Sequence, residues 1–88
     1  MQILYRGQPL SLTRHEFRLL QSLLDQPERV FSREQLLDAV GVPFDAGYER
    51  NIDSHIKSLR SKLRSVAADA EPIQTHRGLG YSYSPSHS

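Results

Sequence analysis

Residues 50–64 combine an apolar stripe with a face of small hydroxyl and cationic side chains. The stripe recurs at the spacing of one helical face and consists of Ile52, Ile56, Leu59 and Leu63. At about 100° per residue, the opposite face carries Arg50, Ser54, Lys57 and Ser61. A helix of this kind can anchor its back in a core and bring its front close to base edges and phosphates in a DNA major groove. The alternative is an ordinary solvated surface helix, although serines stand here where such a helix more often carries Glu and Lys pairs.

A second cationic feature lies in residues 73–83. Residues 73–75 read as a strand, residues 76–80 as a tight turn and residues 81–83 as the return strand. Gly78 and Gly80 permit the positive φ angles of a sharp turn, and Arg77 projects from it as a long cation suited to a minor groove or a phosphate. The competing interpretation makes Arg77 a solvated hairpin residue and Tyr81 a core aromatic.

The positive charge is concentrated in these same segments. The 88 residues carry a net charge of only +1, which argues weakly against a nucleic-acid partner. Within residues 50–64, however, five basic residues stand against one acidic residue. Screening confines electrostatic attraction to about 8–10 Å, so a local patch on a near-neutral body is enough to engage phosphates.

Composition argues against several other classes of function. The chain has no cysteine, which removes disulfides, thiolate metal sites and a Cys nucleophile. The four histidines share no ligand spacing, and no Gly-rich phosphate loop follows a strand, so we predict no metal, no cofactor and no enzymatic activity. No apolar run approaches the roughly 20 residues of a membrane span, and the N-terminus lacks a signal-peptide layout. We therefore expect a cytoplasmic protein without a membrane partner.

Local signals set the elements that would position the two cationic segments. Capping boxes at Thr13/Glu16 and Ser32/Gln35 predict helices over residues 14–25 and 33–40, the first stopped by Pro27 and the second by Gly41. A short hairpin is expected over residues 2–5 and 9–12. Residues 41–49 form a loop, and residues 84–88 a disordered polar tail.

This order of elements predicts one α+β domain over residues 1–83. It is a winged helix-turn-helix with three helices, a C-terminal β-hairpin wing and a short N-terminal β-hairpin. Eighty-eight residues allow a single domain with a small core.

Four sequence blocks resemble the DNA-binding effector domain of OmpR/PhoB-type response regulators. They are residues 12–20 (Leu-Thr with Glu-Phe and Leu-Leu), residues 30–37 (Val-Phe-Ser-Arg-Glu-Gln-Leu-Leu), residues 50–63 and residues 75–81 (Thr-His-Arg-Gly-Leu-Gly-Tyr). Residues 53–57 and 72–78 further resemble the CreB/BaeR-like subgroup. The sequence departs from the family pattern at Gly41, where an aromatic is usual, at Asn51, where Thr is commoner, and at Ser58, where many members have a cation.

The resemblance implies a transcription factor that recognises direct repeats in double-stranded promoter DNA as a tandem dimer. It implies a receiver domain in cis, N-terminal to these residues, and a contact of loop 41–49 with RNA polymerase. It places DNA contacts from the recognition helix at Asn51, Ser54, His55, Lys57 and Ser58, phosphate contacts at Arg50 and Arg60, and wing contacts at Thr75, Arg77 and Tyr81. A winged-helix protein-interaction module that binds an acidic partner remains the alternative.

Overall fold

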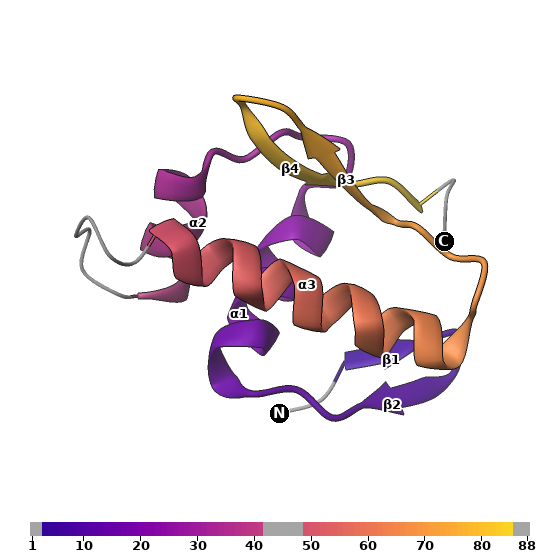
Figure 1. The fold of residues 1–88 in the computed structure, drawn as a ribbon. Helices are drawn as coiled ribbons and strands as arrows, with labels where there is room; N and C mark the ends of the chain where they lie inside the picture. The colour runs from indigo at the N-terminus through magenta and orange to yellow at the C-terminus, as the bar shows by residue number, and fades with distance from the viewer. Residues whose placement is uncertain (1–2, 42–48, 86–88) are drawn as a thin grey trace.

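The computed structural model describes residues 3–41 and 49–85 and contains three helices and two antiparallel hairpins, as predicted (Figure 1). The elements, in chain order, are β1 (Ile3–Tyr5), β2 (Gln8–Leu10), α1 (Arg14–Asp25), α2 (Arg33–Val40), α3 (Glu49–Val66), β3 (Ile73–His76) and β4 (Gly80–Tyr83). The long helix α3 crosses the middle of the domain. The β3–β4 hairpin lies along one side of it, and the β1–β2 hairpin lies near its C-terminal end (Figure 1).

Both predicted capping boxes are present at the starts of α1 and α2. The Thr13 hydroxyl accepts from the backbone N–H of Glu16 at 3.2 Å, and the Glu16 carboxylate accepts from the N–H of Thr13 at 2.9 Å. Ser32 and Gln35 repeat the exchange before α2. Gly41 ends α2 in the left-handed conformation, with φ of +88°, and donates to the carbonyl of Leu37 at 3.0 Å. These local signals account for the agreement between predicted and observed helix ends.

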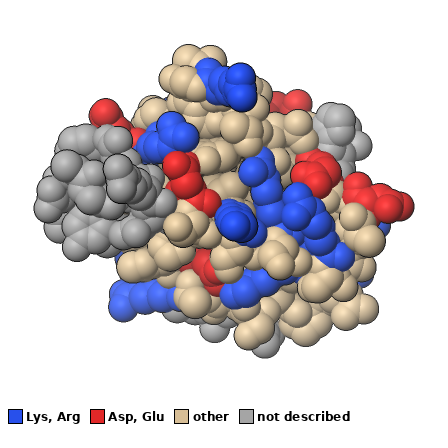
Figure 2. Space-filling view, viewed as in Figure 1, with Lys and Arg blue, Asp and Glu red and all other residues tan. Residues whose placement is uncertain are grey.

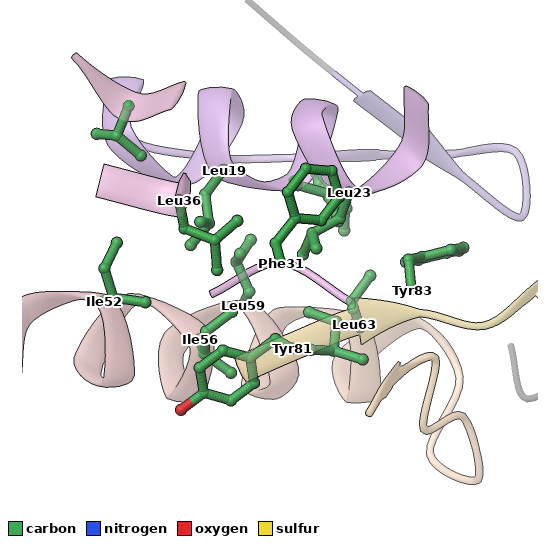
Figure 3. Packing of buried hydrophobic residues seen from close by; sticks show 14 of the residues in the cluster. Leu19, Leu23, Phe31, Leu36, Ile52, Ile56, Leu59, Leu63, Tyr81 and Tyr83 are labelled. Atoms are coloured by element: carbon green, nitrogen blue, oxygen red, sulfur yellow. The ribbon is translucent and has the colours of Figure 1, made fainter. Parts of the chain in front are cut away.

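The predicted apolar stripe is the inner face of α3. Its four residues are at most 1% exposed. In Figure 3 they point toward Leu19 and Leu23 of α1, Leu36 of α2 and the aromatic residues Phe31, Tyr81 and Tyr83. Full burial of each such aliphatic side chain stabilises a fold by about 1.5–3 kcal/mol. This packing fixes which face of α3 is turned away from the core.

The β3–β4 hairpin is anchored to the segment between α1 and α2. Its register pairs Ile73 with Tyr83 and His76 with Gly80. In addition, Phe31 and Tyr81 exchange backbone hydrogen bonds of 2.8 and 2.9 Å. Gly80 has the expected positive φ, and a side chain there would place its Cβ 1.8 Å from the carbonyl oxygen of Phe31. Gly80 is thus required by close backbone approach as well as by the turn, and sequence inspection found only the second reason.

Three boundary predictions need correction or lie beyond the described residues. Helix α3 runs from Glu49 to Val66, somewhat longer than the predicted 50–64. Ser84 was predicted to begin a disordered tail, but it is buried and its N–H donates to the carbonyl of Pro72 at 2.7 Å. Residues 86–88, and residues 42–48 of the predicted loop, lie outside the described residues. Among the helices that are described, none combines the length and the apolarity that a membrane crossing requires.

Candidate nucleic-acid interface

The outward face of α3 presents part of the predicted set of contacts. Ser54, Lys57 and Ser61 are exposed, as the helical phase predicted. Arg50 and Asn51 belong to the first turn of α3, but their side chains lie outside the described part of the structure. Figure 2 shows Lys and Arg side chains gathered on the face of the molecule that carries α3 and the β3–β4 hairpin, with a few acidic side chains among them. On this face, exposed Lys and Arg side chains can contact a polyanion.

Two other predicted contacts, His55 and Ser58, are half-buried and turned toward α1. The His55 ring stands edge-on to His15, with centroids 5.5 Å apart and an interplanar angle of 80°. Burial lowers the pKa of His55, and the neighbouring His15 lowers it further, while Glu16 acts in the opposite direction. Ser58 hydrogen-bonds the Glu16 carboxylate. Both residues therefore connect α3 to α1, and both lie beside the outward face of α3.

An ion pair with a buried carboxylate also connects α1 to α3, and no motif in the sequence predicted it. Lys62 Nζ donates to Glu16 Oε1 at 2.5 Å, with the Glu16 side chain only 3% exposed. Burial alone would raise the pKa of Glu16, but hydrogen bonds from Lys62, Ser58 and the Thr13 backbone outweigh it and lower the pKa from 4.5 to about 2. Glu16 thus caps α1 and anchors α3 with the same carboxylate.

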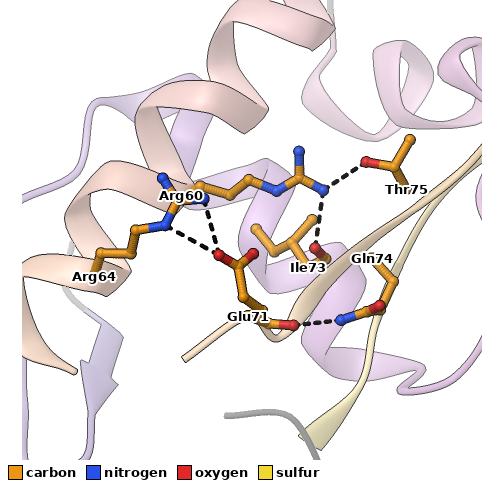
Figure 4. A network of polar contacts seen from close by, with 6 residues as sticks. All are labelled: Arg60, Arg64, Glu71, Ile73, Gln74 and Thr75. Atoms are coloured by element: carbon orange, nitrogen blue, oxygen red, sulfur yellow. Dashed lines mark hydrogen bonds and ion pairs between the residues drawn. The ribbon is translucent and has the colours of Figure 1, made fainter. Parts of the chain in front are cut away.

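At the wing, the structure brings two predicted contacts together. Arg60 Nη2 donates to the Thr75 hydroxyl at 2.6 Å and to the carbonyl of Ile73 at 2.9 Å (Figure 4). Arg77 lies in the exposed turn two residues beyond Thr75. No ion pair within residues 3–41 and 52–85 occupies Arg77 or Lys57. These two cations are therefore available to a ligand, whereas Arg60 is engaged within the domain.

Tyr81 belongs to the core, as in the interpretation that competed with its prediction as a contact to the DNA backbone. The residue is 5% exposed, and its hydroxyl donates to Asp53 Oδ1. Burial raises the pKa of Tyr81, and the hydrogen bond to Asp53 raises it further. Asp53 also accepts from Arg33 Nε at 3.0 Å. Arg33 and Asp53 were not recognised in the sequence as partners, because 20 residues separate them and neither stands in a motif that pairs them.

The described residues contain no group of three or more His, Asp or Glu side chains that could hold a metal ion. The chemistry that this surface offers is hydrogen bonding and cationic charge.

Comparison with known proteins identifies the family. A family model described as "Transcriptional regulatory protein, C terminal" matches residues 7–83. The chain belongs to this family. The resemblance to OmpR/PhoB-type effector domains, drawn from four sequence blocks, is thereby confirmed.

The chain is similar to two curated transcriptional regulatory proteins of Escherichia coli. It is 53% identical over 81 residues to CreB of strain K12, which covers 92% of this chain and 35% of CreB. It is 48% identical over 80 residues to BaeR of E. coli O6:H1 strain CFT073, which covers 91% of this chain and 33% of BaeR. The chain thus spans about a third of the length of these relatives, and both names agree with the predicted subgroup.

Solved effector domains have the same fold. The response regulator AdeR DNA-binding domain, solved in complex with an intercistronic region, has a TM-score of 0.82 at 29% identity and covers 94% of this chain and 84% of that one. The Klebsiella pneumoniae RstA DNA-binding domain, solved in complex with the RstA box, has a TM-score of 0.77 at 32% identity and covers 96% and 83%. In this winged-helix family, α3 corresponds to the predicted recognition helix and β3–β4 to the wing.

Proposed function

We propose that this chain is the effector domain of a response-regulator transcription factor and binds double-stranded DNA in a sequence-specific manner. Helix α3 enters the major groove with its outward face, and Arg77 of the wing reaches the adjacent minor groove. The observation that carries the proposal is the two-sided nature of α3: its inner stripe is fully buried while Ser54, Lys57 and Ser61 remain exposed. The similarity to AdeR and RstA, both solved with DNA, supports it.

The residues divide into those that read bases and those that position the domain. Asn51, Ser54 and Lys57 read base edges, Ser58 lies beside them with its side chain turned toward α1, and Arg50 and the N-terminal end of α2 contact phosphates. With few long polar side chains on α3, one copy makes few bidentate base contacts, so its specificity ratio is modest. A second copy bound in tandem on a direct repeat supplies the remainder.

We extend the proposal to the intact protein by analogy with the same family. The intact protein carries a receiver domain in cis, acts in the cytoplasm and contacts RNA polymerase through loop 41–49.

Selection from a pool of random duplexes tests the proposal. We expect recovery of a repeated half-site at fixed spacing. Binding to the recovered duplex should show a linear fall of log K with log salt, by about 0.9 per phosphate contacted. A domain that recovers no common sequence, and that binds an acidic protein surface instead, would be the interaction module considered as the alternative.

Arg77→Ala tests the wing separately. Its loss of affinity should be larger on A·T-rich flanks than on G·C-rich flanks, because a narrow minor groove concentrates negative potential around an inserted arginine. An equal loss on both flanks would contradict minor-groove insertion. Lys57→Ala serves as the matched control, since a contact in the major groove has no reason to depend on flank composition.

A further inference from the structure

One arginine side chain of α3 bonds directly to strand β3 of the wing. Arg60 Nη2 bridges the carbonyl of Ile73 and the hydroxyl of Thr75, both on β3 (Figure 4). Its guanidinium carbon lies 5.8 Å from the centroid of the Tyr81 ring on β4, and its Nε is buried. Arg60 therefore contacts both strands of the wing and directs part of its charge into the domain.

Asp53 forms the second connection, two helical turns before Arg60 on the same side of α3. It accepts from the Tyr81 hydroxyl and from Arg33 Nε of α2. The guanidinium of Arg33 also stands 5.7 Å from the Tyr81 ring. The buried Tyr81 side chain thus donates its hydroxyl to Asp53, and the guanidinium groups of Arg33 and Arg60 lie near its ring. These contacts connect α2, α3 and the wing.

The two strands of the wing are supported differently. Strand β4 is fixed by backbone pairing with Phe31 and by the close approach at Gly80. Strand β3 leads into Arg77; it pairs with β4 and buries Ile73 in the core, and it receives hydrogen bonds from α3 through Arg60. A two-stranded hairpin is marginal without such support. A displacement of about 1 Å is enough to weaken a contact that depends on preorganised geometry.

We infer that Arg60 is a positioning residue, which sets the wing so that Arg77 reaches DNA, and not the phosphate contact that its place in the sequence predicted. The inference rests on the proposed DNA-binding function. It assigns the contribution of Arg60 to Arg77, so the two residues must be energetically coupled in binding.

A double-mutant cycle tests this coupling. The probe is the duplex recovered by selection, and the variants are Arg60→Gln, Arg77→Ala and the double substitution in the full chain. Arg77→Ala should weaken binding about tenfold in the native background but less than about threefold beside Arg60→Gln. The matched control is Lys57→Ala, beside which Arg77→Ala should keep its tenfold effect. Equal effects of Arg77→Ala in all three backgrounds would overturn the inference.

Salt dependence separates positioning from direct contact. In the Arg77→Ala background, Arg60→Gln should leave the slope of log K against log salt unchanged. A lost phosphate contact would reduce the steepness of that slope by about one. A wild-type chain that binds no duplex would refute the proposed function itself, which is a different outcome from additivity between Arg60 and Arg77.

A measurement on the free protein covers the case in which Arg60→Gln does not fold. Thr75→Val removes one of the two acceptors and keeps the size and charge of the site. Its amide chemical shifts should change in residues 75–80 and remain as in the wild type at residues 52–56. The same cycle with Arg77→Ala should again be less than additive, and full additivity with unchanged wing shifts would overturn the inference.

Discussion

Two polar clusters hold α3 on different sides, and they differ most in their exposure to solvent. In the inner pair, between α1 and α3, the Glu16 carboxylate is 3% exposed and the Lys62 side chain 33% exposed, so the two clusters differ in the burial of their acidic member. The outer network comprises Arg33, Asp53 and Tyr81, in which the side chains of Arg33 and Asp53 are 38% and 47% exposed. The two clusters contain similar ion pairs, so their different surroundings decide what each contributes.

A buried charge that loses its partner is costly, whereas an exposed ion pair contributes little because water replaces the partner. The inner pair should therefore matter for the stability of the fold. The outer network, which connects α2 and the wing to α3, should matter for the geometry of the surface that meets DNA. Substitutions in one cluster at a time separate these two contributions.

Substitution in the inner pair should have the largest effect. Glu16→Gln keeps a residue able to complete the capping box but removes the buried carboxylate that accepts from Lys62, and it should lower the free energy of unfolding by about 2 kcal/mol, as for the loss of a hydrogen bond to a charged group. Urea denaturation measures this change. Glu34→Gln, at an exposed position in the first turn of α2, is the matched control and should change stability by less than about 0.5 kcal/mol. Equal effects of the two substitutions would remove the distinction between the clusters.

Acid should act through the same carboxylate. The pKa of Glu16 is about 2 in the folded chain against 4.5 for the free group, so the unfolded chain takes up the proton first. Its contribution is complete above pH 4.5 and is lost as the pH falls toward 2, by up to about 3 kcal/mol. Between about pH 5 and pH 2.5, the urea midpoint of unfolding should therefore fall more steeply with decreasing pH for the wild type than for Glu16→Gln. Parallel curves would contradict the assignment.

On the outward face of α3, a new charge should affect binding and leave the fold intact. Ser54→Glu places a carboxylate where phosphates and base edges approach, and we expect DNA affinity to fall by more than about 100-fold. Circular dichroism should show an unchanged thermal transition, because Ser54 is exposed. Gln21→Glu adds the same charge on the exposed side of α1 and should alter affinity far less. A melted Ser54→Glu variant would show that this face of α3 is needed for packing.

The outer network should tolerate substitution with a small loss of stability. Asp53→Asn retains an oxygen that can accept from Tyr81 and removes the charge that pairs with Arg33. It should lower the free energy of unfolding by less than about 1 kcal/mol. Urea denaturation of Asp53→Asn and Glu16→Gln under the same conditions measures the difference between the two clusters directly. A loss as large as that of Glu16→Gln would mean that the exposed network carries stability after all.

The smallest effect is expected from His55. Burial, then the neighbouring His15, lower its pKa below the ordinary value of 6.5, against the opposing effect of Glu16, whose carboxylate is bonded to Lys62. The unfolded chain therefore binds a proton first, and stability that is complete above pH 6.5 declines as the pH falls below it, by less than about 1 kcal/mol. Proton NMR titration of the ring should give a pKa that rises in His15→Gln. An unchanged pKa in that variant would remove His15 as a cause.

Helix positions were predicted well because their signals are local. The Thr13/Glu16 and Ser32/Gln35 boxes act over three residues, and the buried stripe of α3 repeats every three or four. The wing turn was also readable from its glycines. The position of each site residue was harder to predict: Ser54, Lys57 and Arg77 are exposed as expected, whereas Arg60 and Tyr81 are engaged within the domain.

The order of the elements, the helix caps and the inner and outer faces of α3 depend on spacing along the chain, so the amino acids alone predict them. The pairing of polar groups depends on the fold: Arg60 meets Thr75 across 15 residues, Tyr81 meets Asp53 across 28 and Lys62 meets Glu16 across 46. Charge and hydrogen-bonding capacity are properties of single side chains, but a partner is a matter of distance in space. Packing of the apolar core sets that distance, and so it decides which cations remain free to meet DNA.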